Sequence, residues 1–281
     1  MKSIRNRGAR GPAAALLAVL FLVAPACDRA AEPPWAFEVG GHKAFLMQPE
    51  KPAGPADARP WLWFAPTLKH LPSSAHLWIF SRLLTNGIAI AGVDVGEARG
   101  SPAGVEQFHA FHAEMVRRGF SRQPALLGQS RGGIMLLTWA MRHPESVGAF
   151  AGIYAVCNFE DWPLKRSLEP TMKDFGLDEA ALRAQAKAFN PVENLAGLAA
   201  RRVPMFFVHG DSDQVVPWTE NGGLLVPRYR AAGGEAKVVL VPGLGHQVAP
   251  QFFESQVLVD FLLQQVPPRA PAASPAMPRK L

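Results

Sequence analysis

Cysteine is scarce in this sequence, which has only Cys27 and Cys157 among its 281 residues. If Cys27 is removed with an N-terminal signal or carries lipid, no disulfide can form within the chain. Cys157 is then expected to be a small buried apolar residue. Apolar residues make up 48% of the chain, enough for one large core in a single catalytic-size domain.

Three kinds of ligand signature are missing. No pair of His or Cys residues stands at the spacing of a metal site, and the glycine pattern at 128–133 has no lysine after it, so it is not a phosphate loop. No basic run is interleaved with aromatic residues, as is typical of nucleic-acid binding. We therefore expect no metal, no cofactor and no nucleic-acid partner.

The N-terminal apolar run is too short to span a bilayer, which takes about 20 residues. It covers residues 13–23, follows a basic start and precedes small residues, the layout of an export signal over residues 1–26. An uncleaved signal anchor is the alternative. Four of the cations behind the net charge of +6 lie in this segment, so the mature chain is close to neutral.

The sequence VAPAC at 23–27 resembles a bacterial lipobox, although it lacks the usual leucine and contains Pro25. Cleavage before Cys27 fits either ordinary export or lipid attachment. We expect an exported protein that is periplasmic, secreted or anchored to the membrane through lipid on Cys27. Residues 27–34 are predicted to be a linker.

Strands and helices alternate along the rest of the chain. A glycine-centred hairpin is predicted at 35–49, and apolar runs predict buried strands at 59–66, 87–94, 124–129, 147–154, 203–210 and 236–243. Helical patterns lie between them, which implies parallel pairing under right-handed crossovers. The first helix is expected to bury Leu77, Phe80, Leu83 and Leu84, and the last to bury Phe253, Val257, Leu258, Phe261 and Leu262.

This alternation predicts one α/β domain at 35–266, with a mostly parallel central sheet flanked by helices. The interval 159–202, after the sixth strand, is longer than a simple connection and contains a strong helical segment. We expect a small helical insertion over one edge of the sheet. The tail at 267–281 is rich in Pro and Ala and is predicted to be disordered.

The pattern Gly128-Gln129-Ser130-Arg131-Gly132 falls where a predicted strand turns directly into a helix. This is the context that a G-x-S-x-G nucleophile elbow requires, because residues without a Cβ let the turn close while the serine hydroxyl projects. A serine that merely caps the helix is the alternative.

A serine nucleophile needs a base, and the base needs a group that fixes its tautomer. Asp211 and Asp213 follow one strand, and His246 follows the last strand. Each lies at the carboxyl end of a strand, where ligands meet such sheets. The sequence therefore offers Ser130, His246 and one of the two aspartates as a catalytic triad.

These motifs resemble the α/β-hydrolase superfamily, especially dienelactone hydrolases and the catalytic domains of prolyl oligopeptidases, over residues 35–265. The resemblance implies that Asp213, the second carboxylate of G-D-x-D-x-x-V-P, holds the histidine while Asp211 shapes the turn. It also implies an oxyanion hole, to which the amide of Arg131 would contribute. Where many relatives carry His-Gly for the second amide, this chain has WFAPTLKH, so Thr67 is the first candidate and Leu68 the next, since Pro66 has no amide hydrogen.

Other side chains near the expected site allow two interpretations each. The Arg131 side chain is expected to pair with Glu97 or Asp94, although it could bind a substrate carboxylate. Trp162 and Trp218 are candidate substrate-binding residues that could stack on a sugar or aryl group, or belong to the core. His209 is expected to be a core residue.

The motifs predict a serine hydrolase that acts through an acyl-enzyme on Ser130. We favour a carboxylesterase on a small or carbohydrate-linked ester. The first alternative is a peptidase of the prolyl oligopeptidase kind, although those relatives generally add a β-propeller, which we do not expect in this chain. The second is a non-catalytic lipoprotein that keeps the fold as a binding module.

Overall fold

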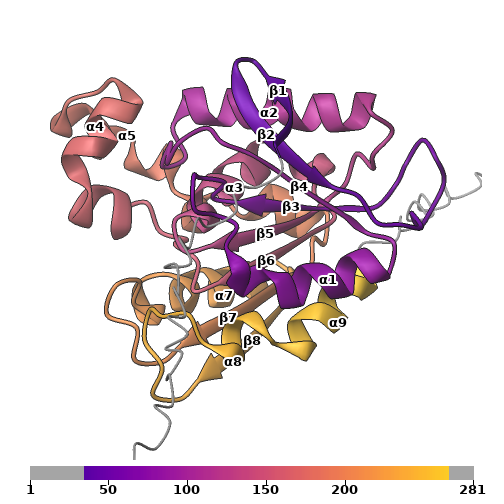
Figure 1. Cartoon of the computed structure of the whole chain (residues 1–281). Coiled ribbons are helices and arrows are strands. Elements are labelled where there is room, and N and C mark those ends of the chain that lie inside the picture. Colours follow the sequence, from indigo (N-terminus) through magenta and orange to yellow (C-terminus); the bar gives the residue numbers. More distant parts are fainter. Residues whose placement is uncertain (1–34, 266–281) are drawn as a thin grey trace, which may run out of the picture. The chain divides into compact units, whose positions relative to one another are not determined.

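The structure, a computed structural model, describes residues 35–265. The predicted export signal, Cys27, the linker and the C-terminal tail therefore lie outside the described residues. Eight strands form one sheet in the order β1-β2-β4-β3-β5-β6-β7-β8 (Figure 1). They are β1 (Trp35–Val39), β2 (His42–Met47), β3 (Trp61–Ala65), β4 (Ala89–Val93), β5 (Ala125–Gln129), β6 (Ala149–Ile153), β7 (Met205–Gly210) and β8 (Ala236–Val241).

The sheet is parallel except at one edge. β1 and β2 form an antiparallel hairpin and β2 pairs antiparallel with β4, whereas every later neighbour pair is parallel. The predicted hairpin, the six later strands and the mostly parallel sheet are confirmed. Because the parallel strands end at the same edge, the loops that follow β3, β5, β6, β7 and β8 are brought together there.

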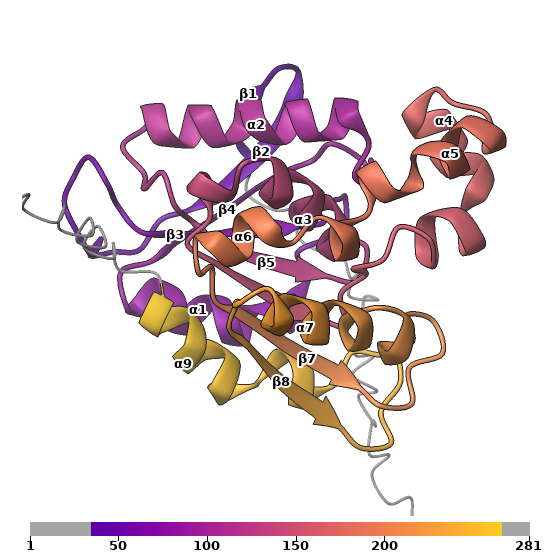
Figure 2. The same cartoon turned by 180° about the vertical axis from the view of Figure 1, so that it is seen from behind.

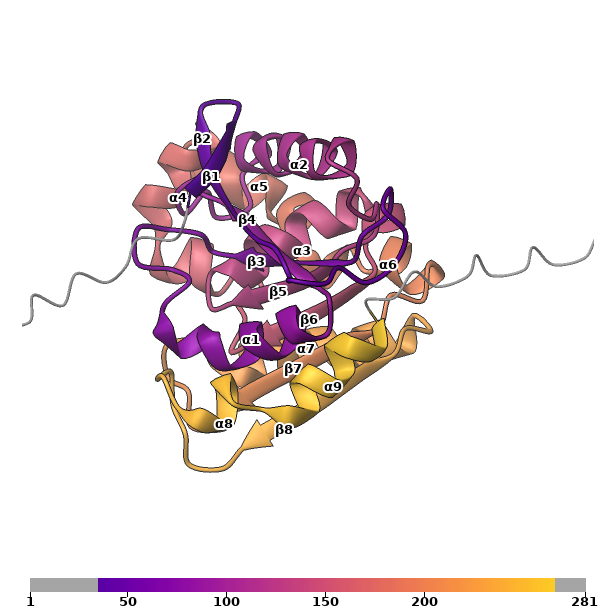
Figure 3. The same ribbon diagram turned by 45° about the vertical axis from the view of Figure 1, so that its right-hand side comes forward.

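Helices cover both faces of the sheet (Figure 3). One face carries α2 (Pro102–Arg117), α3 (Gly132–Arg142), α6 (Ala196–Ala200) and α7 (Gly222–Ala231); the other carries α1 (Leu77–Thr85), α8 (Pro250–Phe253) and α9 (Gln256–Gln265). Successive residues of a strand point to opposite faces, so Trp63 packs against Trp139 on the first face while Phe64 packs against Phe80 on the second. Among the described residues, no helix has the length and apolar character of a membrane span.

The predicted insertion follows β6 and is helical. It contains η3 (Trp162–Arg166), α4 (Leu168–Phe175) and α5 (Glu179–Phe189), and Asp178 caps α5 through a 2.8 Å bond from the Ala181 amide. Figure 2 shows α4 and α5 beyond the end of the sheet to which β5 and β7 point. Their apolar cluster packs on Ile134 of α3, on Val156 and on Val216. The insertion therefore stands at the edge where the loops converge.

Two expected helix faces are wrong in part. Leu77 is 55% exposed because α1 turns Ile79, Phe80 and Leu83 inward. The last helix is in fact two helices: α8 ends at Phe253, and Ser255 accepts a hydrogen bond from the Leu258 amide at the start of α9 (3.4 Å). Because of this break, the residues after Ser255 face other directions than they would in one continuous helix, and Val257 is exposed.

The orientation of α9 predicts different losses of stability when the side chains of two adjacent residues are truncated. Leu258 is fully buried, so Leu258→Ala should lower the free energy of unfolding by about 2–5 kcal/mol. Val257→Ala, the matched control on the exposed side, should change it by less than about 0.5 kcal/mol. Urea unfolding of both variants measures the difference, and equal losses would contradict the break at Ser255.

Candidate active site

Ser130 occupies a sharp turn between β5 and α3. Its φ of 49° lies in the left-handed region, which non-glycine residues seldom adopt. Neighbouring backbone groups hold this conformation: the Ser130 amide donates to Ile153 O (3.0 Å), and its carbonyl accepts from the amides of Val156 (2.8 Å) and Gly133 (3.0 Å). The turn is therefore fixed to the end of β6.

The glycines around Ser130 are required by close packing. A Cβ on Gly128 would lie 2.7 Å from Gly133 Cα, so it would separate α3 from β5. A Cβ on Gly132 would overlap the backbone of Ala65 at the end of β3. Both positions therefore need glycine if α3 is to start directly above the sheet, with the segment that follows β3 at its side.

The structure brings Ser130, His246 and Asp213 into one hydrogen-bonded row. Ser130 Oγ lies 2.9 Å from His246 Nε2, and His246 Nδ1 lies 2.8 Å from Asp213 Oδ2. Because a carboxylate only accepts, Nδ1 carries the imidazole proton and Nε2 is free to accept the serine proton. These three side chains come from loops after β5, β7 and β8.

Asp213 is buried but fully hydrogen-bonded. Burial opposes its ionisation, yet the bonds from His246 and from the amides of Val216 (2.8 Å) and Val215 (2.9 Å) outweigh burial and hold the pKa of Asp213 below its usual value. Asp211, in contrast, is exposed and accepts from the amide of Gly243 (2.8 Å), so it braces the turn toward β8.

His209 is a buried core residue, as the sequence indicated. Its Nε2 donates to Val216 O (2.7 Å), and burial lowers the pKa of its imidazole, which is therefore neutral at pH 7. Its Nε2 also lies 3.5 Å from Asp213 Oδ2, the oxygen that accepts the bond from His246. Cys157 is also fully buried, and burial raises the pKa of its thiol, so it remains protonated.

Two backbone amides are available near the elbow. Within the described residues, neither the Arg131 amide nor the Thr67 amide donates to another protein group, whereas the Leu68 amide is bonded to Leu71 O (3.0 Å). The Thr67 side chain is turned back onto Phe64 O (3.2 Å). Thr67 therefore has the freer amide of the two candidates that follow Pro66.

The Arg131 side chain forms the expected ion pair with Glu97. Glu97 also binds Arg99 (2.9 Å), and Arg99 in turn pairs with Asp174 of α4. The guanidinium groups of Arg131 and Arg99 each lie 5.7 Å from the ring of Trp162. This network links the start of α3 to the insertion and balances the charge of Arg131.

The two tryptophans lie in different surroundings. Trp162 is partly exposed at the start of η3, and its ring faces the guanidinium groups of Arg99 and of Arg131, the residue after Ser130. Trp218 packs against the rings of His209 (5.3 Å) and Phe207 (6.2 Å). Its geometry is that of a packing residue, and a substrate role for either ring stays a prediction.

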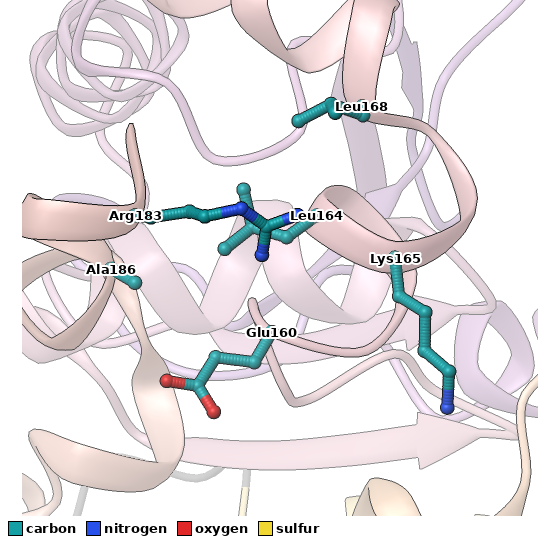
Figure 4. A pocket seen from close by; sticks show the side chains of 6 residues that line it. All are labelled: Glu160, Leu164, Lys165, Leu168, Arg183 and Ala186. Carbon is teal, nitrogen blue, oxygen red and sulfur yellow. The ribbon is translucent and has the colours of Figure 1, made fainter. Parts of the chain in front are cut away.

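A hollow of about 620 Å³ lies within the insertion (Figure 4). Its walls come from the segment around η3 and from α4 and α5, and they are formed by Glu160, Leu164, Lys165, Leu168, Arg183 and Ala186. None of the triad residues lines it, and Arg183 is already paired with Glu179 (2.7 Å). Within residues 35–265, no group of three or more His, Cys, Asp or Glu side chains is arranged to hold a metal ion.

Tyr154 is a neighbour of the triad that sequence reasoning missed. Its ring centroid lies 4.3 Å from that of His246, and its φ of 36° is again left-handed. Its place at the carboxyl end of a strand was the available signal, because the other site residues share that position.

Residues 96–266, more than half of the chain, match the model of the prolyl oligopeptidase family. The chain belongs to the prolyl oligopeptidase family. It is a serine hydrolase of that family with the α/β-hydrolase fold, and the predicted resemblance is confirmed. No protein among the curated sequences matches the chain.

Solved structures share the fold of this family member at low sequence identity. A puromycin hydrolase matches with a TM-score of 0.62 and 18% identity over 84% of this chain and 39% of its own. A puromycin-hydrolyzing peptidase of Mycobacterium tuberculosis gives 0.63 and 16%, over 80% of this chain and 37% of its own. The chain thus spans about two fifths of these relatives.

A third similar structure is esterase 2 of Thermogutta terrifontis, phosphonylated by sarin. It matches with a TM-score of 0.58 and 15% identity, over 83% of this chain and 95% of its own. The similar structures thus include both peptidases and an esterase.

The lowered pKa of Asp213 predicts a stability difference that depends on pH. The ionised carboxylate stabilises the folded state above its unfolded pKa of about 4, and this contribution is lost as pH falls through the lower folded pKa. The gap in unfolding free energy between wild type and Asp213→Asn should therefore be full near pH 7 and shrink below about pH 4. Urea unfolding across this range measures it. A gap that widens on acidification would contradict the hydrogen-bonding account, and Asp211→Asn is the exposed control.

Proposed function

We propose that Ser130, His246 and Asp213 form the catalytic triad of an acyl-transfer reaction. The observation that carries this proposal is the row of bonds from Ser130 Oγ to His246 (2.9 Å) and from His246 to Asp213 (2.8 Å). His246 takes the hydroxyl proton as Ser130 attacks the substrate carbonyl, and then gives it to the leaving group. Water, activated by the same imidazole, releases the acyl group.

Two backbone amides are assigned the role of stabilising the negative charge that develops on the attacked carbonyl oxygen. The Arg131 amide begins α3 beside the nucleophile, and the Thr67 amide follows β3, which Gly132 allows to approach the elbow. Fixed amides stabilise such charge because they need not reorganise during the reaction. The Arg131 side chain plays no part in this step, since it is held by Glu97.

The substrate class we propose is a small or carbohydrate-linked carboxylic ester, with Trp162 at the entrance to the site. The similarity to Thermogutta terrifontis esterase 2 over nearly its whole length supports an ester substrate for this domain. We further propose that the enzyme acts outside the cytoplasm, as the N-terminal sequence indicates, with a lipid anchor on Cys27 as one form.

Hydrolysis of an amide or peptide bond is the second candidate. It is supported by the family match and by the puromycin-hydrolyzing and acylaminoacyl peptidases among the similar structures. The triad performs the same acyl transfer on either bond, so the leaving group distinguishes the two candidates.

Covalent labelling tests the nucleophile. A fluorophosphonate probe should label the wild-type protein at Ser130, Ser130→Ala should abolish labelling, and His246→Gln should slow it by roughly 10⁴-fold or more. Ser81→Ala, at an exposed serine of α1, is the control and should label like wild type. A folded wild type that does not react would favour the non-catalytic binding module.

A matched substrate pair tests the leaving group. For one acyl group, the p-nitrophenyl ester and the corresponding anilide should be compared, with puromycin as a further amide. The ester proposal predicts turnover of the ester only, lost in Ser130→Ala. Turnover of aminoacyl anilides or puromycin that depends on Ser130 would contradict the ester proposal and support the peptidase.

A further inference from the structure

A chain of buried polar side chains runs beneath the proposed base. His76, Gln129 and Tyr154 are each less than 10% exposed, and they come from the segment before α1, from β5 and from the end of β6. His76 Nε2 lies 2.9 Å from Gln129 Oε1, and Gln129 Nε2 lies 2.9 Å from Tyr154 Oη. The triad reaction described above uses none of these three side chains.

The Gln129 side chain sets the direction of the bonds in this chain. Its Oε1 can only accept, so His76 Nε2 carries the imidazole proton, and His76 Nδ1 accepts from the Ser73 amide (3.0 Å). Because Oε1 accepts the bond from His76 Nε2, the Gln129 amino group is turned toward Tyr154. Burial lowers the pKa of His76 and keeps it neutral, so the arrangement does not reverse near pH 7. The Tyr154 hydroxyl is thereby held at a single place.

The ring of Tyr154 is held against the imidazole of His246. The centroids are 4.3 Å apart with the planes tilted by 51°, which is within the distance at which an aromatic face attracts a cation. Phe252 packs edge-on against the ring of Tyr154 (5.3 Å). The left-handed backbone at Tyr154 is a costly conformation that directs the ring to this place.

We propose that Tyr154 is a positioning residue for His246: its anchored ring aligns the imidazole between Ser130 and Asp213 and stabilises the imidazolium that forms during acyl transfer. This inference rests on the proposed function. The other groups that face His246 are Ser130 from the elbow and Asp213 from the loop after β7, and the neutral His209 contacts the same oxygen of Asp213 (3.5 Å). Asp213 supplies the charge partner, and Tyr154 supplies the aromatic one.

The test uses the full chain and two readouts, one of which needs no activity. The first is the titration of the His246 ring by NMR of histidine-labelled protein, with the signal assigned by its loss in His246→Gln. The second is kcat and KM on the best ester substrate. Tyr154→Leu removes the ring, Tyr154→Phe keeps the ring and loses the hydroxyl, and Phe252→Leu removes a ring that contacts Tyr154.

Loss of the ring should destabilise the charged imidazole. Tyr154→Leu should therefore move the midpoint of the His246 titration to lower pH by roughly half a unit or more, and lower kcat by roughly 3- to 30-fold with little change in KM. Tyr154→Phe should restore the midpoint and most of kcat. Phe252→Leu should lower stability without moving the midpoint.

The outcome that overturns the inference is a folded Tyr154→Leu with the wild-type midpoint, or a Phe252→Leu that moves the midpoint equally. If Tyr154→Leu does not fold, Tyr154→Met provides the same comparison. A shifted midpoint in a protein that neither labels nor turns over would refute the proposed function, yet would leave the contact between Tyr154 and His246 intact.

Discussion

The backbone torsion of Ser130 is the constraint on which the site depends. A left-handed residue of this kind costs about 1–3 kcal/mol and persists only where its surroundings fix it. Here the end of β6 fixes it, by bonding both to the Ser130 amide and to its carbonyl. The same turn starts α3 with a free amide and holds the hydroxyl above the sheet. Geometry that would be unfavourable in isolation is thus maintained by two neighbouring strands.

Charge is distributed around this turn so that each ionised group has a partner. Asp213 is buried with both oxygens occupied, while the neighbouring imidazole of His209 stays neutral and adds no competing charge. Arg131, the residue next to the nucleophile, is paired with Glu97 rather than left open to the site. The electrostatic field at Ser130 therefore comes mainly from fixed amides and one oriented carboxylate, as acyl transfer requires.

Local patterns allowed much of this arrangement to be predicted. Strands buried on both faces appear in the sequence as unbroken apolar runs, so β5 and β7 were placed correctly, and the elbow lies within five consecutive residues. Helix faces were less predictable. The residues that α9 buries depend on the break between α8 and α9 at Ser255, and the apolar spacing of the sequence did not indicate that break. The contact of Tyr154 with His246, and its bonds through Gln129 to His76, join segments that only the assembled sheet brings together, so periodicity could not indicate them.

The apolar cluster of the insertion meets the main domain at Ile134, Val156 and Val216, and the rest of it lies among the insertion's own side chains. A segment built this way can change its surface, or its helix lengths, without disturbing the packing of the sheet. The insertion can thus vary in sequence without loss of the fold, whereas the row of reacting side chains cannot change without loss of the site. Members of this fold could acquire new preferences by remodelling one peripheral unit, and leave the machinery beneath it unaltered.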